Sequence, residues 1–336
     1  MRSVLAATTA LVVMLLPMSG CADDPTGDDR PDPTSAGGGL GPGTRLDVSA
    51  IEGAVAATRA VPSARVELAT LYRGLGGVDD TPAGARDVRL VQRAAFDRRT
   101  GRASAESDMS ELAAVVEAAD RDVAGDYSRP ASVVVDGDTM YAQLGPMAEA
   151  IGLEPTTWVE RDVAGLGDEQ LDNEAMALLL EPFGMLDLLA LPLEAVHVVG
   201  PDEVRGTAAT RVEATVDLGR VAARAEAAED AERSGAGVGD EGDPEAEAPI
   251  DPGDAALVER FRRLGLSELP VELWLDDDRL VRRLAFSVGR HGAAASSPGT
   301  LTTTFDIYDV GTPIDVVIPS GPDVIDQAEL RARVTG

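Results

Sequence analysis

The chain has 336 residues, with 59 Asp and Glu against 29 basic residues, all of them Arg, and a formal net charge of −30 at pH 7. This balance excludes nucleic-acid binding, which depends on basic side chains that neutralise phosphates, and it opposes direct adsorption to anionic lipid. One Cys and two His are too few for a disulfide, a zinc site or a histidine-based catalytic triad.

The N-terminal segment predicts a lipoprotein signal. Arg2 precedes an uncharged stretch over residues 3–20, which leads into Cys21, as expected of a secretory signal. Met18-Ser19-Gly20-Cys21 resembles a lipobox in which Met replaces the usual Leu, and the resemblance implies that Cys21 is diacylated and becomes the first residue of the mature protein. The alternative is an ordinary cleaved signal with an incidental cysteine. A membrane-spanning helix is disfavoured because the apolar run is shorter than about 20 residues.

The composition divides the chain into three parts. Residues 1–20 form the signal peptide, residues 21–45 a disordered tether of mainly small and polar residues, and residues 46–330 a single domain. Within the domain, the acidic, Gly/Pro-rich segment 235–253 is predicted to be a disordered insertion. Its carboxylates could attract calcium loosely, but the segment lacks the ligand spacing of an EF-hand loop, so a solvated linker is favoured.

Periodicity predicts the first elements. A capping-box pattern at Ser49–Glu52 begins a helix, and alternating apolar and charged residues then indicate antiparallel strands with one buried side. Asp136-Gly137 is a strong hairpin signal. Residues 111–124 fit a helix better than a continued strand. The predicted elements are a helix over 48–60, strands over 64–72, 87–97 and 103–109, a hairpin over 132–143 and a short strand at Trp158.

The segment 168–191 is the most hydrophobic one after the signal. Asp168 can cap one helix and Pro182 can begin a second, short helix, with apolar residues around nearly the whole circumference. Such a segment must be enclosed by protein or contact an apolar ligand. Both a buried central helix and the wall of a lipid cavity fit this pattern, and the first is favoured.

The remaining segments are mostly predicted strands. Asp276-Asp-Asp278 is interpreted as a solvated turn rather than a metal or acid–base cluster, and His197 and His291 as structural or solvated residues. The predicted elements are a hairpin of 193–199 and 208–218 around 200–206, helices over 220–233 and 254–264, and strands over 270–275, 280–288, 300–308 and 314–318.

The ordered series of hairpins over residues 48–320 resembles the LppX/LprG group of mycobacterial lipoproteins and, more distantly, the LolA-like lipoprotein carriers. The resemblance implies an α+β fold in which a large curved antiparallel sheet, a half-barrel, carries helices on its concave face around an apolar cavity. The turn departs from the group at Arg279, where Gly is expected. The residues that carry the resemblance are 133–141, Trp158, 204–206, 210–213, 270–276, 280–283 and 305–313.

These observations predict a lipoprotein anchored to the cell membrane on its extracytoplasmic side, which binds or carries a lipid or lipoglycan and has no enzymatic activity, cofactor or metal. The composition, rich in Arg and Ala without Lys, is associated with actinobacteria. The alternative is an envelope interaction protein with a filled core. A hydrolase is disfavoured because no Gly-x-Ser-x-Gly elbow is present. The predicted cavity-lining residues are Met140, Trp158, Leu178, Leu179, Met185, Leu186 and Leu189.

Overall fold

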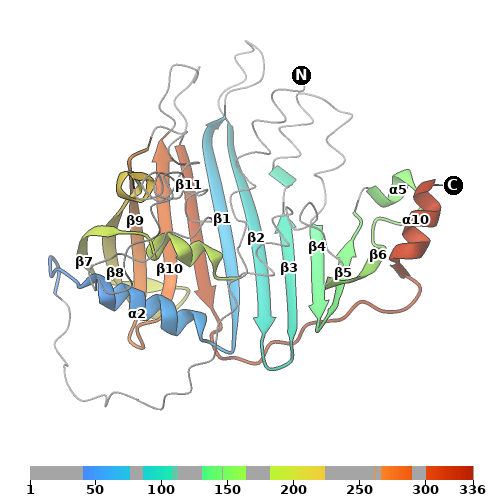
Figure 1. The fold of residues 1–336 in the computed structure, drawn as a ribbon, viewed down its shortest axis with the longest axis horizontal. Helices are drawn as coiled ribbons and strands as arrows, with labels where there is room; N and C mark the ends of the chain where they lie inside the picture. Colours follow the sequence, from blue (N-terminus) through green and yellow to red (C-terminus); the bar gives the residue numbers. More distant parts are fainter. Residues whose placement is uncertain are drawn as a thin grey trace, which may run out of the picture.

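A single twelve-stranded sheet dominates the computed structural model (Figure 1). The structure describes residues 41–75, 86–108, 110–111, 131–145, 147–163, 182–223, 261, 266–289 and 300–335. The strands are β1 (Ser63–Leu75), β2 (Arg86–Asp97), β3 (Arg102–Asp108), β4 (Ala131–Asp136), β5 (Thr139–Gln143), β6 (Trp158–Asp162), β7 (Leu193–Val204), β8 (Thr207–Asp217), β9 (Glu268–Asp276), β10 (Val281–Gly289), β11 (Thr300–Tyr308) and β12 (Val324–Asp326).

The sheet is open, with β12 at one edge and β7 at the other, in the order β12-β6-β5-β4-β3-β2-β1-β11-β10-β9-β8-β7. All neighbouring pairs are antiparallel except β12 and β6, which run parallel. The described helices are few: α2 (Val48–Arg59), α5 (Met147–Ala150), the 3-10 helix η3 (Gly184–Leu189) and α10 (Gln327–Thr335). The predicted α+β fold with a large, mainly antiparallel open sheet is confirmed.

Alternation along the strands gives the sheet two different faces. On one face, Leu284 of β10, Phe305 of β11 and Leu68 of β1 lie side by side, and all are buried. We call this the helix-bearing face. On the other, the outer face, the next position along each strand places Glu67 beside Asp306. Antiparallel sheets commonly have one apolar face packed on the core and one polar face in contact with water.

Helices α2 and η3 pack on the helix-bearing face near one end of the sheet (Figure 1). Asp47 caps α2, since its carboxylate accepts the backbone N–H of Ser49 at 3.0 Å, so the helix begins before the predicted capping box at Ser49. At the other end of α2, the Thr58 hydroxyl donates to Ala54 and accepts the N–H of Val281 at 2.8 Å. This buried contact fixes α2 to the start of β10.

An extended segment between β11 and β12 crosses the outer face. Ile314 and Val316 of this segment are buried against Ala95 and Val134. The predicted strand over 314–318 is therefore wrong, because these residues pack on the sheet through their apolar side chains and do not pair with a strand. The strand β12 follows it and was not predicted.

The predicted hairpins are present with shifted boundaries. The turn between β7 and β8 contains only Arg205 and Gly206, so both strands extend through most of the predicted loop 200–206. Arg279 adopts a left-handed φ of 59°, the backbone conformation for which Gly was expected. Asp277 and Asp278 are exposed as predicted, but Asp276 is buried and pairs with Arg282 at 2.6 Å.

Several predictions fall largely outside the described residues: the tether, the insertion 235–253, His291 and most of the helices over 111–124, 168–181, 220–233 and 254–264. The division into signal, tether and single domain stays a prediction. No helix among the described residues is long and apolar enough to cross a membrane.

We predict that Phe305→Ala lowers the free energy of unfolding by about 3–5 kcal/mol, because it empties the space of a fully buried ring at the centre of the helix-bearing face. Val317→Ala is the control, since Val317 is 80 % exposed, and it should change stability by less than about 0.5 kcal/mol. Urea unfolding monitored by circular dichroism measures both. Equal effects would contradict the packing described for this face.

Candidate functional site

Four of the predicted cavity residues are buried on the helix-bearing face. Met140, Met185, Leu186 and Leu189 are 1 %, 6 %, 0 % and 1 % exposed and belong to one apolar cluster. Met140 comes from β5, while the other three come from η3. Leu178 and Leu179 lie outside the described residues.

The sequence of η3 explains this arrangement. Pro182 precedes the helix, and the spacing of Met185, Leu186, Leu188 and Leu189 turns apolar side chains toward the sheet. Phe183 packs edge-on against Phe96 of β2, with ring centroids 5.2 Å apart. The 3-10 helix therefore packs beside α2 on the helix-bearing face, in the region predicted to wall a cavity.

Trp158 does not share this face. It is cross-strand from Gln143 on β5, one position away from the pair of Ala142 and Val159 that faces the helices. It packs instead with Val134 and Ile314 in the outer-face cluster. The structure thus separates Trp158 from the other four predicted residues by the thickness of the sheet.

Two buried polar atoms on the strands of the helix-bearing face have no hydrogen-bond partner within the described part of the chain. They are Ser107 Oγ on β3 and Arg161 Nε on β6. Ser107 lies opposite Gln92, which is two residues from Ala94 on the same side of β2. Arg161 lies opposite Met140. Directly opposed side chains in an antiparallel pair point to the same face, so both atoms belong to the apolar side of the sheet.

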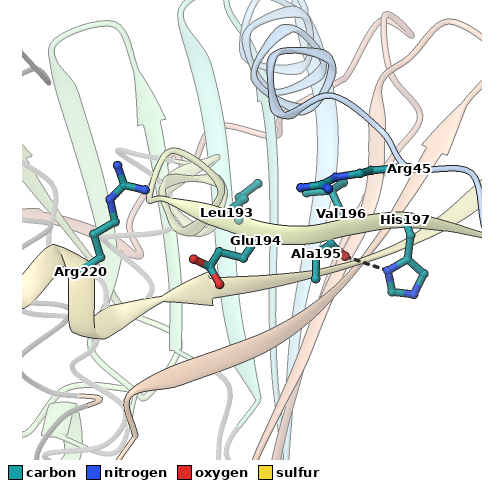
Figure 2. A pocket seen from close by; sticks show the side chains of 7 residues that line it. All are labelled: Arg45, Leu193, Glu194, Ala195, Val196, His197 and Arg220. Carbon is teal, nitrogen blue, oxygen red and sulfur yellow. Dashed lines mark hydrogen bonds between the residues drawn. The ribbon is translucent and has the colours of Figure 1, made fainter. Parts of the chain in front are cut away.

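A pocket of about 670 Å³ opens at the β7 edge (Figure 2). Its apolar residues Leu193 and Val196 belong to the main core, and charged side chains form its rim. Ala195 has a left-handed φ of 52° within a bulge of β7, which is a strained position for a residue with a Cβ atom. The lining residues are Arg45, Leu193, Glu194, Ala195, Val196, His197 and Arg220.

His197 in this pocket projects on the outer side of the strand. Its Nδ1 lies 2.7 Å from the carbonyl oxygen of Ala195, and its Nε2 lies 3.3 Å from a carboxylate oxygen of Glu213. The side chain is 45 % exposed. This agrees with the interpretation of His197 as a structural or solvated residue.

The β7 edge is partly covered by the chain that precedes α2. The Gly43 N–H donates to Val198 O at 2.7 Å, the Val198 N–H donates to Thr44 O at 2.8 Å, and the Leu46 N–H donates to Val196 O at 3.1 Å. These bonds satisfy backbone groups that an edge strand leaves open. The predicted tether therefore enters the domain beside the pocket.

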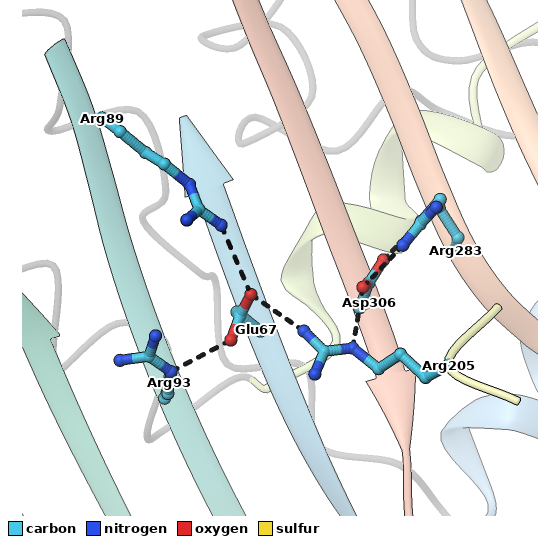
Figure 3. Close-up of polar contacts among 6 residues, drawn as sticks. All are labelled: Glu67, Arg89, Arg93, Arg205, Arg283 and Asp306. Atoms are coloured by element: carbon cyan, nitrogen blue, oxygen red, sulfur yellow. Dashed lines mark hydrogen bonds and ion pairs between the residues drawn. The ribbon is translucent and has the colours of Figure 1, made fainter. Parts of the chain in front are cut away.

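An ion-pair network spans the outer face (Figure 3). Arg205, from the turn between β7 and β8, contacts Asp306 on β11 and Glu67 on β1, each at 2.8 Å. Arg283 of β10 contacts Asp306 at 2.6 Å, and Arg93 of β2 contacts Glu67 at 3.0 Å. The turn is thereby held against two strands, β11 and β1, that are not its neighbours in the sheet.

The network lowers the pKa of Asp306. Burial alone would raise the pKa of this carboxyl, but hydrogen bonds and charges from Arg283 and Arg205 outweigh it. The guanidinium of Arg205 also stacks 4.2 Å from the ring centroid of Tyr308, a favourable cation–π geometry. Sequence reasoning missed this network, because its members come from distant segments.

No group of three or more His, Cys, Asp or Glu residues that could hold a metal ion is present among the described residues. The arrangement on the helix-bearing face offers apolar contact and two hydrogen-bond donors.

Comparison with known proteins gives similarities of fold. No protein-family model and no curated protein matches the chain. The lipoprotein LppX of Mycobacterium tuberculosis is 12 % identical, with 80 % of this chain and 97 % of that chain covered and a TM-score of 0.38. LprF of Mycobacterium bovis is 14 % identical, with 84 % and 100 % covered and a TM-score of 0.41. A LolA superfamily protein of Nitrosomonas europaea is 9 % identical, with 78 % and 91 % covered and a TM-score of 0.23. LppX belongs to the group that the hairpin order resembles.

We predict that Asp306→Asn destabilises the protein by about 2 kcal/mol at neutral pH, because it removes a charged acceptor from two arginines. A carboxyl with a depressed pKa in the folded state contributes stability above its unfolded pKa, near 3.8, and loses it as the pH falls through the folded value. The difference in the free energy of unfolding between wild type and Asp306→Asn should therefore shrink below about pH 4.

Urea unfolding at neutral and at acidic pH measures this effect. Asp309→Asn is the control, since Asp309 is half exposed and pairs with Arg65 at 3.4 Å, and it should cost less than about 1 kcal/mol. A difference that stays constant with pH would show that the Asp306 charge is not the cause.

Proposed function

We propose that this protein is an extracytoplasmic lipoprotein, anchored to the cell membrane through Cys21, that binds or carries a lipid or lipidated molecule. The proposal assigns it no catalytic step. One observation carries it: the sheet presents a continuous apolar face over most of its strands, and the other face carries the ion-pair network. An open sheet with this asymmetry can cover acyl chains on one side while the other contacts water.

The residues around η3 suit a ligand that enters by displacing side chains. Met140 and Met185 have flexible, polarisable side chains that can repack around different shapes. Helix η3 is a single short 3-10 segment, and an ion pair between Arg59 and Asp187 joins it to α2. Each methylene of an acyl chain transferred from water contributes about 0.8 kcal/mol, so a long chain offsets the cost of moving such an element.

A second candidate is an envelope protein with a filled core that recruits a protein partner. The packing around η3 favours it, because Leu186 and Leu189 are 0 % and 1 % exposed. The two candidates differ in whether this packed region opens for an acyl chain. Lipid uptake by the purified protein therefore separates them.

We predict that the protein made from residue 22 onward takes up a fluorescent acyl lipid, and that Ala142→Trp reduces its affinity about tenfold or more. The indole would occupy space on the helix-bearing face, where Ala142 contacts the main core. Gln143→Trp is the matched control on the same strand, since Gln143 points to the outer face, and it should bind like wild type. Repeated recovery and titration of a lipid-free, non-binding protein would favour the filled-core candidate.

We predict that Cys21→Ser moves the protein from the membrane to the soluble extracytoplasmic fraction and abolishes labelling by a palmitate analogue. The thiol is the acceptor for the anchor, and a serine hydroxyl does not replace it. Ser19→Ala, which keeps a small residue before the cysteine, should leave labelling unchanged. Labelled, membrane-bound Cys21→Ser protein would contradict the anchor.

A further inference from the structure

Arg161 occupies an unusual place for a cation. It lies on β6, directly opposite Met140, and therefore on the helix-bearing face. Its neighbour along the strand, Val159, points the same way and is 0 % exposed. Strand β6 is next to the short edge strand β12 (Figure 1), so Arg161 lies near the rim of the apolar face.

The guanidinium of Arg161 lacks the compensation that comparable arginines have. Three arginines among the described residues have a buried, unpaired Nε: Arg59, Arg161 and Arg211. Arg59 is ion-paired with Asp187, and Arg211 with Glu272 at 2.5 Å, in each case through a terminal nitrogen. The Nε of Arg161 has no hydrogen-bond partner, and Arg161 takes part in none of the ion pairs found among the described residues. A buried polar atom without a partner is costly, and a charge-assisted bond would relieve that cost.

A second unpaired atom on the same face points to the same chemistry. Ser107 Oγ is buried without a partner among the described residues, and a hydroxyl can donate a hydrogen bond. Both unsatisfied groups of the helix-bearing strands can thus serve as donors. Ser107 on β3 and Arg161 on β6 are three strands apart and lie at different levels of the sheet, so one headgroup does not reach both. The positive charge of Arg161 selects a ligand with a negatively charged acceptor oxygen.

We propose that Arg161 binds the anionic headgroup oxygen of the lipid, a phosphate or carboxylate, while the acyl chains lie on the apolar face beside Met140. This inference rests on the proposed function and adds a ligand class to it. The planar guanidinium can bind two oxygens of one phosphate or carboxylate group. Its place near the rim leaves the headgroup close to water and directs the chains toward the core.

The test compares two lipids that differ only in the phosphate: diacylglycerol and phosphatidic acid with the same fluorescent acyl chain. Both are titrated into the protein that begins at residue 22. Wild type should bind phosphatidic acid at least about tenfold more tightly, the effect of one charge-assisted hydrogen bond. Arg161→Gln should bind both lipids with the affinity of wild type for diacylglycerol, and Arg161→Lys should keep part of the preference.

Arg102→Gln is the matched control, because Arg102 lies on the outer face of β3 and pairs with Asp136 at 2.9 Å. It should keep the wild-type preference, and thermal unfolding should show that all variants are folded. Binding of both lipids without a preference, or a preference that survives Arg161→Gln, would overturn the role of Arg161 and leave the lipid-binding function standing. Binding of neither lipid would overturn both. Inorganic phosphate is titrated in parallel, and tight binding of it alone would indicate a phosphate site without a role for the chains.

Discussion

The strict alternation of side chains along antiparallel strands is the constraint on which this structure depends. Each strand places every second residue on the helix-bearing face, and cross-strand pairs such as Leu68 with Phe305 and Leu284 with Phe305 extend that face across the sheet. A one-residue slip of any central strand would exchange its apolar and charged sides. The apolar face thus fixes the register, and the same face provides the candidate site.

The outer face stabilises the sheet by different means. Charged pairs around Asp306 and Glu67 connect β1, β2, β10 and β11 with the turn at Arg205. The segment with Ile314 and Val316 covers another part of the outer face with apolar contacts. A chain with a net charge of −30 opposes its own compaction through repulsion, and clusters of arginine around carboxylates reduce that repulsion locally. Among the described residues, the ion pairs between strands thus lie on the outer face rather than on the helix-bearing face.

The alternation of apolar and polar residues was sufficient to predict most of the sheet from the sequence, because long strands with one solvent-exposed side carry a strong local signal. It failed at 314–318, where apolar residues alternate for a different reason: they pack flat on the outer face. It also could not place Trp158, since a short strand at the end of the sheet does not reveal which side meets the helices. The burial of Asp276 goes with contacts across the turn, to Arg282 and to the N–H of Leu280, which the sequence pattern does not reveal.

The candidate site was predictable only in part, for a physical reason. The hydrophobicity of 182–191 identified η3, and both η3 and Met140 are buried in the same apolar cluster. The unpaired atoms of Arg161 and Ser107 had no sequence signal, because an arginine or serine in a strand is usually solvated. Only the register, which pairs Arg161 with Met140, shows that this cation lies on the apolar side.

The most direct test of the account is a crystal structure of the protein from residue 22 onward with a lipid brominated on its acyl chains. Anomalous scattering then locates the bromine atoms without reference to the surrounding chain. We expect the bromine atoms between η3 and the sheet, within van der Waals contact of Met140 or Leu186. Bromine bound beside Trp158 and Ile314 would contradict lipid binding on the helix-bearing face. So would a core that is filled by side chains and contains no bromine at any lipid concentration.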